Sequence, residues 1–269
     1  MPPGFFPRST ALSNVREFIG RSQGLVCEPL LPLIAEQAAK ADSTRSVDPP
    51  VIQAIKQTDL MRLSATRNIS GVEASISTIA RELEAIAGCC ASTAWCLWNH
   101  LCVFHFICAQ LGLAGAETLK RIVAAREWVS FPAGAGTSVH GRAVGDQIII
   151  DGRASFASGS RYGEWAACLF ALEPETPQPG AKPDLRFTVV RTDAPGVSID
   201  PTWFSMSLRA SVAPHLIVCR EVVQKMRVQQ LFSVAKQPAS RENNRGPYPG
   251  ILSQSGVSCQ GSERQRQQW

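Results

Sequence analysis

The sequence Asp151-Gly-Arg-Ala-Ser-Phe-Ala-Ser-Gly159 decides how the second half of this chain is interpreted. A short apolar run at residues 147–150 precedes it, and residues 153–157 can form a second strand. An Asp-Gly pair between two strand-like runs is a strong signal for a β-hairpin. We therefore expect a hairpin at Asp151-Gly152, within a β domain, and a further turn at Gly145-Asp146.

More strands are expected on the C-terminal side of this stretch. Residues 165–172, 185–191 and 216–222 are apolar runs separated by loops that contain proline and glycine. They predict an antiparallel, barrel-like β domain over residues 128–236. The last stretch, residues 237–269, is rich in Gln, Ser, Gly, Pro and Arg without apolar periodicity, so we expect it to be disordered.

On the N-terminal side the pattern is helical. Asp48-Pro49-Pro50 offers an N-cap and a proline in the first turn of a helix. Apolar residues recur at three and four from Ile76 to Ile86, and residues 94–111 are apolar on nearly all sides, as in a helix enclosed by neighbours. We expect an N-terminal segment at 1–24 and a helical domain at 25–127, so the fold class is α+β.

Composition and charge exclude several classes of protein. The chain has 269 residues with 27 Lys and Arg against 22 Asp and Glu and no basic run, so nucleic-acid binding is not indicated. No secretory signal is seen, and the apolar window 96–115 contains Asn99, His100 and His105, which are costly in a membrane. Nine cysteines without a Cys-x-x-Cys pair fit reduced thiols better than a metal site. We expect a cytoplasmic protein with no metal, membrane or nucleic-acid partner.

Several common catalytic motifs are absent from the sequence. There is no Gly-x-Ser-x-Gly elbow, no His-Glu-x-x-His helix and no Gly-x-x-x-x-Gly-Lys-Ser loop. Gly134-x-Gly136 precedes strand-like sequence without opening a helix, so it does not predict a dinucleotide-binding fold. Hydrolase, zinc-protease and nucleoside-triphosphatase functions therefore have no support.

Three short segments stand out: Phe156-Ala157-Ser158-Gly159, Phe131-Pro132-Ala133-Gly134 and Ser92-Thr93-Ala94-Trp95. Together they resemble the acyl-CoA dehydrogenase superfamily, in particular its flavin-dependent monooxygenase branch, and the likeness spans about residues 25–235. Ordinary acyl-CoA dehydrogenases have Thr-Glu-Pro before the β domain and Trp-Ile-Thr-Asn in place of Ser-Phe-Ala-Ser-Gly. The resemblance therefore favours a hydroxylase-type relative.

The resemblance implies a flavin cofactor, FMN or FAD, and assigns residues to its site. Ser158 would contact flavin N5, which is an acceptor when the flavin is oxidised and a donor when it is reduced. The expected cofactor-binding residues are Phe131, Pro132, Ala133, Gly134, Phe156, Ala157, Ser158 and Gly159. The expected substrate-facing residues are Trp95, Asn99 and His100.

Structural roles for the same residues stay open from the sequence alone. Ser158 also fits a turn serine, and residues 131–134 fit a plain loop leading into a strand. Trp95 fits an ordinary core residue, and His100 fits a buried histidine satisfied by a hydrogen bond.

The implied reaction is hydroxylation of a small aromatic or natural-product-like substrate by reduced flavin and O₂, and a flavin reductase could supply the reduced flavin. The family pattern continues as Trp-x-x-x-Gly-Leu-Arg-Gly-Thr-Gly-Ser, whereas residues 203–213 lack those glycines. The family's C-terminal four-helix bundle, which holds its homo-oligomer together, has no counterpart in residues 237–269. We therefore keep open an enzyme inactivated by truncation, an acyl-CoA dehydrogenase-like FAD enzyme acting on acyl thioesters, and a non-catalytic remnant or binding module.

Overall fold

The computed structural model describes residues 24–107, 112–132, 138–174, 176, 180, 183–200, 203–212, 215–224 and 229–230. The chain divides into two compact units, Met1–Phe232 and Ser233–Trp269, and every described residue lies in the first. The predicted disordered tail at 237–269 falls outside the described residues, as does nearly all of the predicted N-terminal segment.

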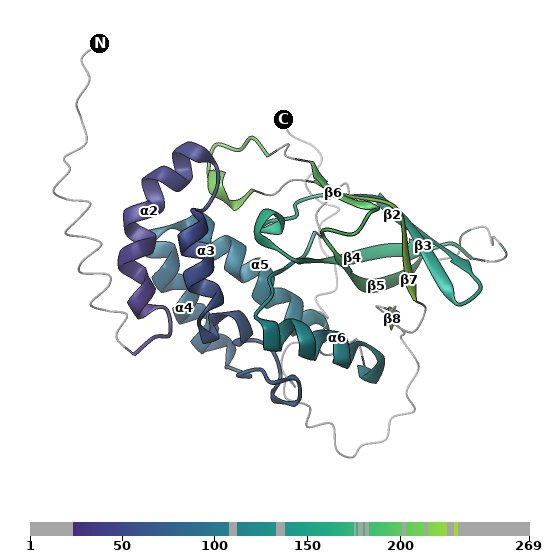
Figure 1. The fold of residues 1–269 in the computed structure, drawn as a ribbon, viewed down its shortest axis with the longest axis horizontal. Helices are drawn as coiled ribbons and strands as arrows, with labels where there is room; N and C mark the ends of the chain where they lie inside the picture. The colour runs from purple at the N-terminus through teal and green to yellow at the C-terminus, as the bar shows by residue number, and fades with distance from the viewer. Residues whose placement is uncertain are drawn as a thin grey trace, which may run out of the picture. The chain divides into compact units, whose positions relative to one another are not determined.

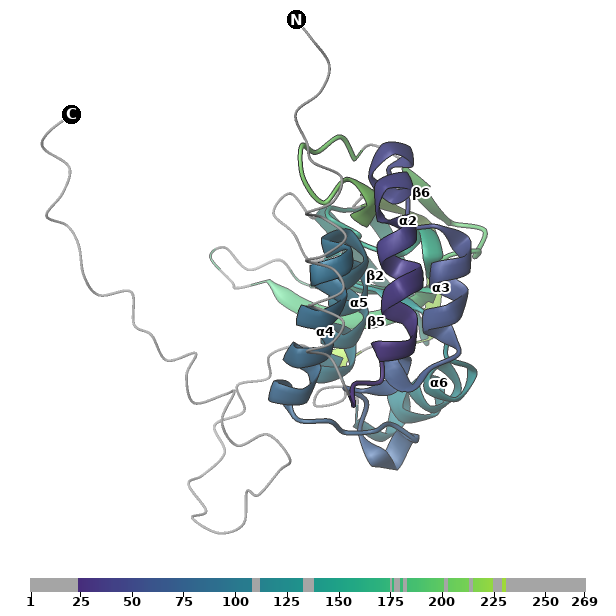
Figure 2. The same cartoon turned by 90° about the vertical axis from the view of Figure 1, so that its left-hand side faces the viewer.

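The predicted order of helices followed by strands is confirmed (Figure 1). The α-helices are α2 (Leu31–Thr44), α3 (Pro49–Lys56), α4 (Ile76–Cys89), α5 (Ala91–Ile107) and α6 (Gly112–Ala125). The 3₁₀ helices are η1 (Glu28–Leu30), η2 (Asp59–Arg62), η3 (Arg67–Ile69), η4 (Ser160–Tyr162) and η5 (Arg209–Ser211). Figures 1 and 2 show α2, α3, α4 and α5 grouped together with the sheet beside them.

Local chemistry explains where these helices begin. Ser75 caps α4, because its Oγ accepts the backbone N–H of Thr78 at 3.1 Å. Pro49 opens α3, where a missing N–H costs nothing. The expected N-cap Asp48 has the right backbone conformation but makes no side-chain capping bond, because its carboxylate pairs with Lys40 at 2.9 Å.

The helix predicted to be enclosed on all sides is exposed along one face. Leu97, Leu101 and Phe104 of α5 are buried, but Trp95 and Trp98 are 41% and 43% exposed. Composition alone could not show this, because both faces of α5 carry apolar side chains.

The strands form a curved, mixed sheet. They are β1 (Val129–Ser130), β2 (Ser138–Val144), β3 (Gln147–Ala154), β4 (Trp165–Leu172), β5 (Asp184–Arg191), β6 (Val197–Asp200), β7 (His215–Gln224) and β8 (Gln229–Gln230). Their order is β6-β7-β3-β2-β4-β5-β8, with β1 beside β4. The expectation of a purely antiparallel sheet was wrong, because β4 pairs in parallel with both β1 and β2. Residues 155–164 carry the chain past β2, so β4 joins the far edge of the β2–β3 hairpin.

The prediction of a hairpin at Asp151-Gly152 was wrong, whereas the turn predicted at Gly145-Asp146 is confirmed and forms the hairpin. These two residues join β2 to β3, and Gly145 has a φ of 57°, as expected for glycine at the first position of a type II′ turn. Asp151 and Gly152 continue β3, where the pairing with β7 shifts register. Gly152 has a φ of 140°, and a Cβ there would lie 2.1 Å from the Ser138 carbonyl oxygen. The Asp-Gly pair therefore marks a β-bulge, a second place where strands require glycine.

Helices and sheet share a hydrophobic core. One cluster contains Phe104 of α5, Ile122 of α6, Val129 of β1, Trp165 of β4 and Phe187 of β5. A second cluster fills the space among the helices, and a third lies within the sheet. Because the shared cluster draws on α5, α6 and three strands, the helices fix the position of the sheet edge at β1.

Within the part of the chain that the structure describes, no helix has the length and apolar character needed to cross a membrane. The same residues contain no group of three or more His, Cys, Asp or Glu side chains placed to hold a metal ion.

Gly145 in the hairpin turn and Gly152 in the bulge of β3 give a matched pair of stability tests. Gly145→Ala should lower the free energy of unfolding by about 1 kcal/mol, because it adds only left-handed backbone strain. Gly152→Ala should lower it by at least about 3 kcal/mol, because the new methyl group also collides with the backbone of β2. Urea denaturation measures both values. Equal losses for the two variants would contradict the bulge.

Candidate functional site

An aromatic pocket of about 460 Å³ lies where α5 meets the loops that follow β1, β3 and β6. Its volume falls in the range of small-molecule sites. The lining residues are Trp95, Trp98, Asn99, Cys102, Phe131, Phe156, Ser158, Trp203, Leu208 and Ser211. None of these side chains carries a formal charge, and five of the ten are aromatic, so the lining favours an uncharged, aromatic ligand surface.

Ser158 and Trp95 are brought together in this pocket. The indole Nε1–H of Trp95 donates to Ser158 Oγ at 3.0 Å. Ser158 is 3% exposed, whereas the Trp95 side chain forms an open wall. The predicted flavin-contact residue and the predicted substrate-facing residue are thus direct partners.

The turn after β3 positions Ser158. Phe156 has a φ of 62°, its carbonyl accepts the N–H of Ser158 at 2.9 Å, and its half-exposed ring lines the pocket. Gly159 has a φ of 77° and donates its N–H to the Ser211 carbonyl at 3.0 Å. A Cβ at Gly159 would lie 3.0 Å from Trp128 Nε1, so only glycine fits here without displacement.

Asn99 clamps the backbone of Phe131. Its Oδ1 accepts the N–H of Phe131 at 2.7 Å, and its Nδ2 donates to the carbonyl of the same residue at 3.1 Å. The amide of Asn99 is therefore committed to this clamp. Since Pro132 has no N–H, any amides that segment 131–134 offers to a ligand would come from Ala133 and Gly134, which lie outside the described residues. Phe131 itself contributes its ring to the pocket.

His100 lies away from the pocket and is fully buried. Its Nδ1 accepts the N–H of Val129 at 2.9 Å, so the ring proton must be on Nε2, which donates to the Met61 carbonyl at 2.9 Å. Burial lowers the pKa of His100 to about 4. His100 is therefore a neutral side chain that connects η2, α5 and β1. This is the alternative of a buried, hydrogen-bonded histidine that the sequence left open.

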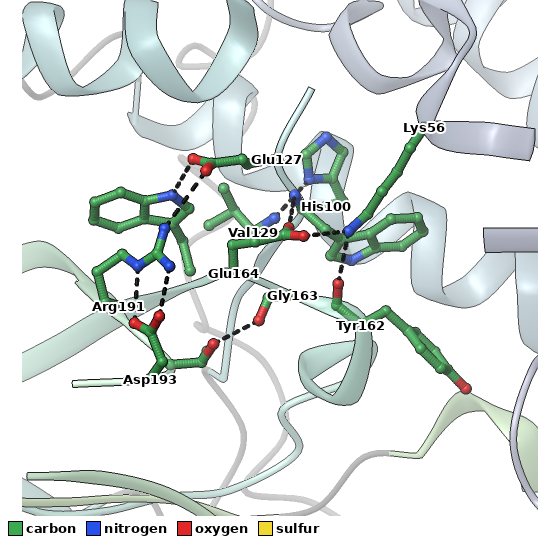
Figure 3. A network of polar contacts seen from close by, with 12 residues as sticks. Lys56, His100, Glu127, Val129, Tyr162, Gly163, Glu164, Arg191 and Asp193 are labelled. Atoms are coloured by element: carbon green, nitrogen blue, oxygen red, sulfur yellow. Dashed lines mark hydrogen bonds and ion pairs between the residues drawn. The ribbon is translucent and has the colours of Figure 1, made fainter. Parts of the chain in front are cut away.

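Glu164 ties the start of β1 to the helices (Figure 3). Its Oε2 accepts the N–H of Trp128 at 2.7 Å, and its Oε1 pairs with Nζ of Lys56 from α3 at 2.5 Å. The Lys56 ammonium also donates to the Tyr162 carbonyl at 3.1 Å. One carboxylate thus links α3, β1 and the turn that follows Ser158.

A second carboxylate joins the same segment to the sheet. Glu127 accepts from Nε1 of Trp165 at 2.5 Å and lies 3.5 Å from the Arg191 guanidinium. Arg191 also pairs with Asp193 at 2.6 Å (Figure 3). The segment that leads into the pocket is therefore held from both sides.

The other predicted residues divide into three groups. Trp95, Asn99, Phe131, Phe156 and Ser158 line the pocket. Pro132, Ala157 and Gly159 are buried and do not line the pocket. Ala133 and Gly134 lie outside the described residues.

The sequence analysis missed half of the lining residues: Trp98, Cys102, Trp203, Leu208 and Ser211. Trp98 could have been found, because it lies three positions after Trp95 on the same helix face, and the two rings are 4.8 Å apart. Trp203, Leu208 and Ser211 come from a loop whose approach to α5 depends on tertiary structure. Burial raises the pKa of the Cys102 thiol, so this side chain is neutral.

The loop that supplies Leu208 and Ser211 has a strained backbone. Leu208 and Val212 have φ values of 50° and 38°, and both flank η5. A β-branched residue rarely adopts this left-handed conformation. Val212 is β-branched, so glycine would suit this backbone conformation better.

The sequence matches no protein family model and no curated protein. Among solved structures, 3-HSA hydroxylase from Rhodococcus sp. RHA1 is 19% identical with a TM-score of 0.64, over 76% of this chain and 50% of that one. Indole-bound TdsC from Paenibacillus sp. A11-2 is 16% identical with a TM-score of 0.67, over 82% and 52%. Nitrososynthase from Micromonospora carbonacea var. africana is 19% identical with a TM-score of 0.67, over 80% and 55%.

These likenesses show that the chain has the acyl-CoA dehydrogenase-like fold found in flavin-dependent monooxygenases. The chain spans about half the length of those structures. XiaF from Streptomyces sp., with a TM-score of 0.65, was solved with FADH2, and TdsC was also solved with FMN and indole.

The buried histidine predicts a pH-dependent stability. Its folded pKa of about 4 lies below the value of about 6.5 expected when unfolded, so the unfolded chain binds a proton first as the pH falls. The contribution of neutral His100 to the free energy of unfolding is complete above pH ~6.5. It declines toward pH 4 by up to about 1.4 kcal/mol per pH unit. His100→Gln should therefore destabilise the protein more at pH 7 than at pH 5, as measured by urea unfolding. A difference from wild type that is the same at both pH values would contradict a neutral His100.

The strained backbone at Val212 can be tested by comparing the stabilities of its glycine and alanine variants. At an ordinary buried position glycine is less stable than alanine, but at a left-handed position it is more stable by about 1 kcal/mol. Val212→Gly should therefore unfold at higher urea concentration than Val212→Ala. Val139, buried in β2, is the control, where the alanine variant should be the more stable. The same order at both sites would rule out the strained loop.

Proposed function

We propose that this chain is the helical and β portion of a flavin-dependent monooxygenase, which uses reduced flavin and O₂ to oxygenate a small aromatic substrate. The observation that carries the proposal is the uncharged aromatic pocket with the Ser158 hydroxyl at its wall. The flavin, when bound, supplies the electrons that activate O₂. A flavin reductase as the source of reduced flavin belongs to the same proposal.

The residues present suit an isoalloxazine ring. A planar tricyclic ring can pack against Trp95, Trp98 and Phe156, and the Ser158 hydroxyl can meet a polar ring edge. Asn99 would act indirectly by holding the backbone of Phe131, so that its ring keeps its place in the wall. The apolar lining would also exclude water around the reacting atoms.

The proposal is supported by printed properties of the structural neighbours. XiaF was solved with FADH2, TdsC with FMN and indole, and HsaA from M. tuberculosis is described as a monooxygenase. TdsC binds indole, an aromatic ring, and the pocket walls described here have the chemistry for the same class of ligand.

A second candidate function is a binding module without catalysis. It is favoured by the open aromatic face, since Trp95, Trp98 and Phe156 are each more than 40% exposed. The strained backbone at Val212 also favours a binding module, because this chain lacks the glycines of the related motif. A ring-binding pocket could survive in such a module while turnover is lost.

Absorption titration tests the proposal. The purified chain should bind FMN or FAD saturably, with the visible bands near ~450 nm perturbed as expected for a protein-bound flavin. Ser158→Ala should weaken binding roughly threefold to tenfold, the effect of one hydrogen bond. Ser160→Ala is the matched control, because Ser160 is equally buried two residues away and does not line the pocket.

The remaining outcomes separate the alternatives. Absence of flavin binding would refute the proposal. Binding without substrate-dependent oxygenation, when reduced flavin and O₂ are supplied, would favour the binding module. Bleaching of bound flavin by an acyl-CoA would favour an acyl-CoA dehydrogenase-like reaction.

A further inference from the structure

The hydrogen bond from Trp95 to Ser158 determines whether the Ser158 hydroxyl donates or accepts toward the pocket. We propose that Trp95 is a positioning residue that fixes the Ser158 hydroxyl as a hydrogen-bond donor toward the ligand, so that the site holds an acceptor atom there in preference to a donor. The ligand is identified as flavin only through the proposed function above.

The chemistry of the two side chains sets the direction. An indole N–H can only donate, so Ser158 Oγ must accept from Trp95 with one of its lone pairs. The hydroxyl hydrogen must then point elsewhere, and no acceptor for it is recorded among the residues that the structure describes. Because Ser158 is 3% exposed, an acceptor on the ligand would satisfy this hydrogen, and a ligand without one would leave it unpaired.

Accepting one bond also changes the strength of the next. A hydroxyl that accepts a hydrogen bond becomes a stronger donor and a weaker acceptor, by roughly 10–30% per bond. Both effects favour an acceptor atom opposite Ser158.

Both partners are held in place, so the direction is a property of the fold. Trp95 stacks on Trp98 with ring centroids 4.8 Å apart and planes inclined by 30°. Ser158 is fixed by its own N–H to the Phe156 carbonyl and by the neighbouring bond from Gly159 to the Ser211 carbonyl. Rotation of either side chain would break the Trp95–Ser158 bond and leave the buried Ser158 hydroxyl without this partner.

For a flavin, the direction discriminates between redox states. Two-electron reduction with uptake of two protons adds a hydrogen at N5 and turns that atom from an acceptor into a donor. The oxidised form should therefore gain more from Ser158 than the reduced form. A hydrogen bond that stabilises the oxidised form more than the reduced form lowers the midpoint potential of the bound flavin, so the reduced flavin gives its electrons to O₂ more readily.

The decisive comparison is Trp95→Phe against Trp98→Phe. Both variants keep an aromatic wall in the pocket, but only the first removes the N–H that Ser158 accepts. Dissociation constants for oxidised and anaerobically reduced flavin, together with the midpoint potential, are the readouts. Trp95→Phe should raise the ratio of the oxidised to the reduced dissociation constant roughly threefold to tenfold. The potential should rise accordingly, by about 30 mV for a tenfold change in a two-electron couple.

A purely structural role for Trp95 would give another result. Equal weakening of both redox forms, with an unchanged potential, would overturn the proposal, as would the same potential shift in Trp98→Phe. In a Ser158→Ala background, Trp95→Phe should have no further effect on the potential. An undiminished effect there would also overturn it.

Two readouts do not require flavin, so failure of the proposed function can be recognised separately. The ¹⁵N-labelled indole N–H resonance of Trp95, assigned from Trp95→Phe, should shift in Ser158→Ala and stay in place in Ser160→Ala. If wild type binds no flavin, quinoline and indole present an acceptor nitrogen and a donor N–H to the same pocket. Wild type should prefer quinoline, and Trp95→Phe should lose that preference. An unshifted resonance, or an equal preference in both proteins, would overturn the proposal.

Discussion

The structure depends on how the backbone N–H groups of residues 128–131 are satisfied. β1 is two residues long and, among the described strands, pairs only with β4, so a sheet ladder cannot satisfy every donor. Glu164 accepts from Trp128, His100 from Val129 and Asn99 from Phe131. Two of these acceptors lie on α5. Since an unpaired buried N–H costs free energy comparable to a lost hydrogen bond, the helix and the sheet edge cannot move apart freely.

This arrangement gives the pocket one rigid side. α5 carries Trp95, Trp98 and Asn99 on consecutive turns, and Asn99 holds the ring of Phe131 beside them. The opposite side comes from loops whose backbones include left-handed residues, Phe156, Leu208 and Val212. Binding sites often combine residues on a rigid helix with residues on strained loops. The loop residues can change without disturbing the core.

The sequence predicted the elements better than their assembly. Apolar periodicity located α4, and a continuous apolar run between loops located β4, since each signal is local. The resemblance assigned Ser158 to the flavin and Trp95 to the substrate, but only the structure shows that they are hydrogen-bonded. The Asp151-Gly152 pair was misread because a hairpin and a bulge both require glycine, and only the pairing with β7 distinguishes them. Likewise, the parallel position of β4 is set by a crossover, and the role of His100 by Val129 and Met61, which are distant in sequence.

The stacked tryptophans of α5 also make the pocket an optical reporter. Three of the six tryptophans in the chain, Trp95, Trp98 and Trp203, line the pocket, whereas Trp128 and Trp165 are buried in the core. The Trp95 and Trp98 rings are 4.8 Å apart, so they exchange excitation energy rapidly. A ligand that absorbs visible light and stacks on either ring would quench the fluorescence of both. The intrinsic fluorescence of this chain should therefore decrease when such a ligand occupies the pocket, with no label attached.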